Sequence, residues 1–142
     1  MASGFYNSGR QLFIRGQLDW NTADIRAVLV NVSGGGTMYT FNATHTTMNN
    51  VVAGWTGGAS GAVIAAPVAL GSKTSADGIA DAADTPFTGV TGDSVEAVIL
   101  YVHNATPANG QLLAYIDGIS VTPNGGDITI IWDNGANKIF KL

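Results

Sequence analysis

Residues 95–102 read VEAVILYV, and this stretch decides the fold class of the chain. Successive side chains of a strand point to opposite faces of a sheet. Val95, Ala97, Ile99 and Tyr101 would share one face, and over the second half of the stretch the other face is apolar as well. A strand with two apolar faces is covered on both, so we expect it to lie centrally in a sheet.

The segments on either side of this strand in the sequence predict its neighbours. Residues 106–110 (TPANG) form a turn, and residues 111–117 (QLLAYID) return as the second strand of a hairpin. Nearer the N-terminus, residues 24–30 (DIRAVLV) alternate in the same manner. This pattern places Ile25, Ala27 and Leu29 on one face and Val28 and Val30 on the other.

Shorter strands are predicted elsewhere, separated by turns rich in glycine and asparagine. They are residues 38–41, 62–70, 78–82, 127–132 and 138–142, of which the last two form a second hairpin around the loop at 133–137. Pro67 cannot donate a ladder hydrogen bond, so it confines the strand at 62–70 to a sheet edge or breaks it. Turns are expected at 33–36 and 123–126, and residues 44–52 are compatible with a single helical turn.

One helix is predicted at residues 5–18. Ser3 is its candidate N-cap, and Phe5, Leu12 and Phe13 share one face at helical spacing. Gly16 is expected near its end. Together these elements predict one mainly β domain over residues 1–142: an antiparallel β-sandwich or jelly-roll-like fold with one short N-terminal helix.

The composition favours a protein that works in an assembly. Only 11% of the residues are charged, against about 25% in an average soluble domain. A surface with so few charges is neutral and polar or is covered by a partner, so we expect a homo-oligomer, a dimer or a trimer. The net charge of −4 and the scattered basic residues argue against nucleic acid and against a membrane surface as partners.

Sequence signals for export or membrane insertion are missing. The first nine residues are polar and do not form the apolar core of a signal peptide. The apolar run at 63–70 is too short to cross a bilayer. There are no cysteines, so disulfides and thiolate metal sites do not contribute. We therefore expect synthesis as a soluble protein in the cytoplasm.

No pattern for catalysis, for a metal or for a cofactor is found. His45 and His103 have no carboxylate or second histidine at ligand spacing, and they are interpreted as surface histidines. The loose group of Asp77, Asp81, Asp84 and Asp93 does not match a calcium loop and is interpreted as solvated carboxylates. The glycine-rich stretches at 34–36 and 57–61 lack the residues of a phosphate-binding loop. We therefore expect a protein that is not an enzyme.

The three tryptophans, Trp20, Trp55 and Trp132, could form platforms that bind sugars. None of them has a cluster of Asp, Asn and Gln beside it in the sequence, so packing in the core or at an interface is the favoured interpretation.

Two parts of the sequence carry a family resemblance. The C-terminal part resembles a short family of virion structural proteins recurrent in tailed bacteriophage genomes, in residues 115–117 (YID), 121–130 (VTPNGGDITI) and 132–140 (WDNGANKIF). The N-terminal pattern at residues 5–7, 16, 19–20 and 25–30 supports it. The resemblance spans nearly the whole chain. It departs mainly at residues 54–76, which are richer in glycine and alanine.

This resemblance implies a structural protein of the virus particle. The preferred expectation is a decoration (cement) protein, which binds the outer surface of the head and stabilises neighbouring subunits of its partner, the major capsid protein. A tail or fibre component, including one that contacts the host, and a carbohydrate-binding module remain alternatives. The candidate interface residues are Phe5, Tyr6, Leu12, Phe13, Trp20 and Trp55.

Overall fold

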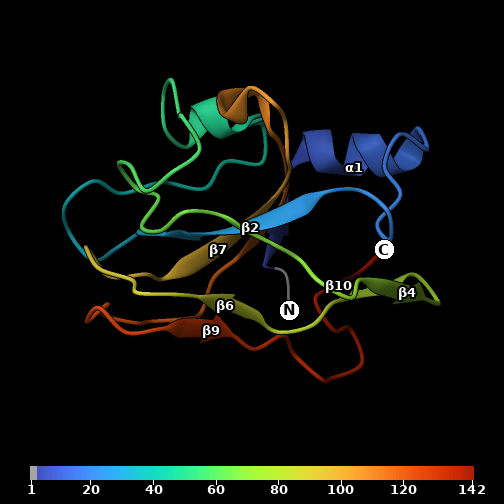
Figure 1. Cartoon of the computed structure of the whole chain (residues 1–142). Coiled ribbons are helices and arrows are strands. Elements are labelled where there is room, and N and C mark those ends of the chain that lie inside the picture. The colour runs from blue at the N-terminus through green and yellow to red at the C-terminus, as the bar shows by residue number, and fades with distance from the viewer. Residues whose placement is uncertain (1–2) are drawn as a thin grey trace.

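The computed structural model describes residues 3–142 and is mainly β, with antiparallel sheets and one α-helix (Figure 1). The helix α1 spans Asn7–Ile14, and two short 3-10 helices, η1 and η2, span Met48–Asn50 and Pro107–Asn109. The strands are β1 (Gly4–Phe5), β2 (Ile25–Val30), β3 (Val68–Ala69), β4 (Thr74–Ala76), β5 (Ile79–Asp81), β6 (Thr85–Phe87), β7 (Ala97–Val102), β8 (Gln111–Ile116), β9 (Ile128–Ile130) and β10 (Phe140–Lys141).

The largest sheet has the order β1-β8-β7-β2-β3, and its centre is the strand that the sequence places there. β7 pairs antiparallel with β2 on one side and with β8 on the other. The predicted hairpin between β7 and β8 is therefore confirmed. β3 is an edge strand that begins directly after Pro67, as expected for a residue that has no N–H to donate.

The two faces of this sheet belong to two buried clusters, as the alternation in β2 predicts. Ile25, Ala27 and Leu29 lie in one cluster, and Val28 and Val30 lie in the other. The first cluster is closed by residues of β5, β6, β9 and β10, which form two smaller sheets. Figure 1 shows these strands on one side of β2 and β7, with η1 and its loops on the other. This layered, antiparallel and sandwich-like class is as predicted, whereas a jelly-roll topology is not confirmed.

The N-terminal helix is shorter than predicted and begins differently. Its N-cap is Tyr6, which makes no side-chain cap hydrogen bond, and Phe5 belongs to β1 instead of the helix. The hydroxyl of Ser3 accepts a hydrogen bond from the N–H of Asp117 at 3.0 Å and donates to its carboxylate. Edge pairing with β8 thus takes the first residues away from the helix. Gly16 follows the helix at φ +64°, where glycine is favoured, so its expected place near the helix end is confirmed.

The prediction of a C-terminal hairpin is wrong. β9 pairs with β6, a strand that the sequence did not indicate, and β10 pairs with β5. The predicted strand at 38–41 is also absent, although Tyr39 is buried there. These segments are two to three residues long, and their partners are distant in the sequence, so local alternation could not choose among them.

The glycine-rich turn at 33–36 is held at its base by a buried asparagine. Asn31 is fully buried, its amide nitrogen donates to the carbonyl of Thr37 at 3.2 Å, and its amide oxygen accepts from the N–H of Gly34 at 2.9 Å. This buried amide, bonded at both ends, closes the turn that follows β2.

Glu96 holds the same turn from the neighbouring strand. Its Oε2 accepts hydrogen bonds from the N–H groups of Val32 and Ser33 at 2.9 and 3.3 Å, and Ser94 donates to Oε1. Burial raises the pKa of Glu96, but these hydrogen bonds outweigh it and hold the pKa below its ordinary value of 4.5.

This contact predicts an acid-sensitive contribution to stability. Because the pKa of Glu96 is lower in the folded than in the unfolded chain, its stabilisation is complete above pH 4.5 and is lost as the pH falls through the folded pKa. The Glu96→Gln variant should melt at a lower temperature at neutral pH and should lose less stability on acidification to about pH 3. Circular dichroism melts of both proteins across this range measure the effect. If the melting temperatures of the parent and the variant fell equally with pH, the acid sensitivity would come from other carboxylates.

Candidate protein-docking surface

The N-terminal helix and the C-terminal strand are joined by a cluster of aromatic rings. Phe140 of β10 is buried, and its ring is in edge-on contact with Phe5, Phe13 and Trp20 at centroid distances of 4.9, 5.9 and 5.1 Å. The strand alternation explains this position, because Phe140 points inward and Lys141 is exposed. The cluster fixes α1 beside β10.

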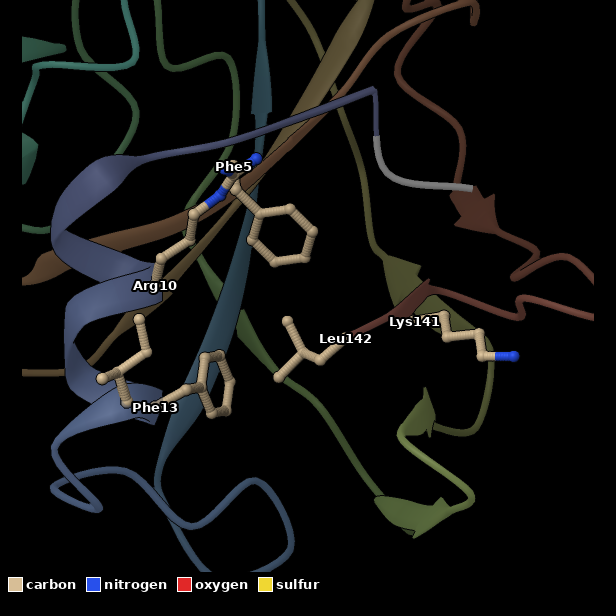
Figure 2. Close-up of a pocket in the computed structure, with 6 residues that line it drawn as sticks. Phe5, Arg10, Phe13, Lys141 and Leu142 are labelled. Carbon is tan, nitrogen blue, oxygen red and sulfur yellow. The ribbon is translucent and has the colours of Figure 1, made fainter.

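A hollow opens at the surface between these two elements. Its volume is about 530 Å³, and it is lined by Phe5, Arg10, Phe13, Ile14, Lys141 and Leu142. Figure 2 shows Phe5, Phe13 and Leu142 around one space, with Arg10 along its side and the amine of Lys141 extended away. A second hollow of about 380 Å³ shares Phe13 and Leu142 with the first and continues toward Trp20 and Ile79. We call the two hollows together the docking groove.

Two of the most exposed large apolar side chains of residues 3–142 lie in the docking groove. Ile14 is 80% exposed and Leu142 is 60% exposed, while Met38 and Ile131 lie outside the groove. Exposed apolar side chains that gather around a hollow are typical of an interaction site, in contrast to single apolar residues scattered over a surface.

The charges near the groove are few. The guanidinium carbon of Arg10 lies 5.5 Å from the centre of the Phe5 ring, a cation–π contact. In the part of the chain that the structure describes, Arg26 pairs with Asp24 and Lys138 with Asp81, and neither pair involves the groove. Asp19 lines the second hollow. The groove is therefore mainly apolar, and its lining carries three charged side chains, those of Arg10, Lys141 and Asp19.

The structure divides the six predicted interface residues into two sets. Phe5 and Phe13 line the docking groove, and Leu12 is partly buried beside them against the first core cluster. Tyr6, Trp20 and Trp55 are at most 5% exposed and belong to the core, although Trp20 also lines the second hollow of the groove. Ile14, Arg10 and Leu142 were not among the predicted interface residues, although an isoleucine two residues before the helix-ending Gly16 was a visible signal.

The tryptophan rings are internal and are held by hydrogen bonds. Trp20 donates to the carbonyl of Asp81 at 3.1 Å, Trp55 to that of Gly58 at 2.8 Å and Trp132 to that of Ala83 at 3.0 Å. All three are at most 5% exposed, so the packing interpretation is confirmed. None of the three rings offers an open face on which a sugar could stack.

The polar side chains serve local structure. His45 is bonded through Nδ1 to the Tyr39 hydroxyl at 2.8 Å, and Tyr39 is bonded to Tyr6 at 3.0 Å. Burial is the main cause that raises the pKa of Tyr6, so its hydroxyl stays protonated.

The predicted acidic group does not form one site. Asp84 accepts the N–H of Trp132 at 3.0 Å, and Asp81 pairs with Lys138 at 3.7 Å. Among residues 3–142, no three His, Cys, Asp or Glu side chains gather as metal ligands would. Within the same residues, no helix has the length and apolar character needed to cross a bilayer.

Comparison with known proteins adds no family. No family of known proteins matches the chain, and no curated protein matches its sequence. The docking groove is therefore the feature from which a function is argued.

Proposed function

We propose that this protein is a non-enzymatic structural component of a tailed-phage particle, a decoration protein that binds the outside of the head and stabilises neighbouring subunits of the major capsid protein. The observation that carries the proposal is the docking groove, in which Ile14 and Leu142 are largely exposed around an apolar hollow. The resemblance of residues 121–140 to virion structural proteins supplies the setting.

The composition supports the same proposal. With 11% charged residues, the chain has little charge with which to cover its surface, as is typical of a protein held in an assembly. The groove is built on α1 and β10, which the aromatic cluster around Phe140 holds rigidly. A preorganised apolar site loses little conformational entropy when a partner side chain enters it. Hundreds of such contacts on one head would add up without any chemical step.

The test of the groove is a substitution at its most exposed residue. Ile14→Asp should leave the fold intact, because the side chain is 80% exposed, and should weaken binding to heads lacking the protein. Burial of an isoleucine side chain contributes about 1.5–3 kcal/mol, so the loss should be roughly 10- to 100-fold in affinity. Co-sedimentation of the purified protein with depleted heads of the virus that encodes it measures this.

Ile131→Asp is the matched control. Ile131 is also an exposed isoleucine, at 65%, but lies outside the groove, so this variant should bind as the parent does. Equal binding by the parent and both variants would remove the groove from the proposal. A copy number near that of the major capsid protein, measured by band densitometry of purified particles, is expected. A band one or two orders of magnitude weaker would instead place the protein in the tail.

A further inference from the structure

One of the smaller sheets ends at β4, the first strand of the β4–β5 hairpin, and the outer edge of this strand is unprotected. This sheet has the order β10-β5-β4, so within residues 3–142 no strand pairs with the outer side of β4. All three residues of β4, Thr74, Ser75 and Ala76, are exposed, and Figure 1 shows the strand at the periphery of the molecule. Edge strands are commonly protected by a charge, a proline or a bulge, and β4 contains none of these.

The backbone groups at the centre of β4 face outward. Ser75 is paired with Ala80 of β5, and the carbonyl of Ala80 accepts a hydrogen bond from Ile139 on the opposite side, at 3.1 Å. In an antiparallel sheet, the N–H and C=O of one residue point to the same neighbouring strand. The groups of Ala80 point to β10, so Ala80 and Ser75 form a non-hydrogen-bonded pair. The N–H and C=O of Ser75 therefore point away from β5 toward the open edge.

The sequence around Ser75 is complementary to itself. In an antiparallel pair of two copies centred on Ser75, Thr74 of one copy lies opposite Ala76 of the other, and Lys73 lies beside Asp77. Both ends then bring opposite charges together. Neither Lys73 nor Asp77 makes an ion pair within residues 3–142. The hydrogen bond from Arg26 and, to a smaller extent, the charge of Lys73 lower the pKa of Asp24, which is paired with Arg26 at 2.9 Å.

We propose that β4 is a homotypic docking edge, at which two copies pair antiparallel about a two-fold axis through Ser75. The Ser75 N–H of each copy donates to the Ser75 carbonyl of the other, and two Lys73–Asp77 pairs flank them. The two three-stranded sheets become one six-stranded sheet. A self-complementary patch of this kind is what a two-fold dimer requires.

The contact is short, so the association is weak in dilute solution and is fixed by high local concentration. It covers about five residues of each chain, well below the area of a standard stable interface. A disulfide that links two copies covalently is for this reason a better measure of the contact than dimer elution in size-exclusion chromatography. The chain has no cysteine, so a single introduced thiol reports one contact.

The experiment compares disulfide formation in two single-cysteine variants. Ser75→Cys places the two sulfurs across the two-fold axis, where opposed strands bring the Cα atoms about 5.5 Å apart, within disulfide range. Thr129→Cys is the matched control, because Thr129 is also an exposed residue at the centre of a three-residue strand, β9. Under mild oxidation, the Ser75→Cys protein should form covalent dimers at least ten-fold faster. Equal rates would overturn the proposal.

Charge variants test the register. In the Ser75→Cys background, Lys73→Asp sets like charges against each other and should slow dimer formation roughly five-fold. The Asp77→Lys variant, made in the same background without Lys73→Asp, should slow dimer formation equally. Mixing the two variants should restore the rate of dimer formation, because opposite charges then face each other at both ends. Because Asp77 has φ +54° in a tight turn, Asp77→Asn is a second variant that keeps the turn and removes the charge pairs. Rates unaffected by all of these changes would contradict the register and the proposal.

Discussion

The Phe140→Ala variant should lose about 3–5 kcal/mol of unfolding free energy, the largest single effect that the structure predicts. Phe140 is 3% exposed and touches three other aromatic rings, those of Phe5, Phe13 and Trp20. Truncation removes the buried ring and leaves a cavity where α1, the loop after it and β10 meet. The surrounding rings belong to separate elements of the fold and cannot collapse together to fill it.

Chemical denaturation followed by tryptophan fluorescence measures this loss, and a melting temperature lower by roughly 10–20 °C should accompany it. Phe140→Leu is the control, because it keeps most of the apolar volume and should lose considerably less. Since Phe5 and Phe13 line the docking groove, Phe140→Ala should also disorder the groove and weaken partner binding. A loss below about 1 kcal/mol would show that the aromatic cluster does not fix α1.

Gly9→Ala should destabilise the protein by about 2 kcal/mol, although alanine is the better helix former. Gly9 is the buried residue of α1, and a Cβ added there would lie 2.7 Å from the Cα of Leu113. Leu113 is the extra residue of a β-bulge in β8, between the pairs of Leu112 and Ala114 with β7. Its carbonyl is already bonded to the N–H of Tyr6 at 3.1 Å. The backbone on both sides is therefore fixed, and the helix has to move away.

The helix propensity of alanine contributes about 1 kcal/mol in the opposite direction, and we expect the steric term to exceed it. Gly71→Ala is the control. Among the described residues, nothing lies within 4 Å of a Cβ added at Gly71, so that variant should be neutral or slightly more stable. Thermal unfolding of the two variants beside the parent measures the difference. A Gly9→Ala protein as stable as the parent would show that α1 can shift on the sheet at little cost.

The centre of the fold could be predicted because its signals are long and local. β2 and β7 are six-residue strands with apolar side chains on both faces, and β8 follows β7 through a turn rich in Pro, Asn and Gly. Alternation then fixed both their type and their faces. The expectation that Phe5 and Phe13 would be interface residues came from the apolar character of the N-terminal segment. They line the groove, but the distinction between these and the buried Tyr6 and Trp20 depended on packing.

By itself, therefore, the sequence determined the class of the fold, the central strands and the shortage of surface charge. Only the tertiary structure decided which short strands pair. β10 pairs with β5 and β9 pairs with β6, although the partners are far apart in the sequence. Strands of two or three residues have no alternation pattern that would identify their partner. The tertiary structure also decided the docking groove and the β4 edge. Both are surfaces that no other segment of residues 3–142 covers. Whether a segment is covered depends on how all the elements pack, so it cannot be deduced from the local sequence.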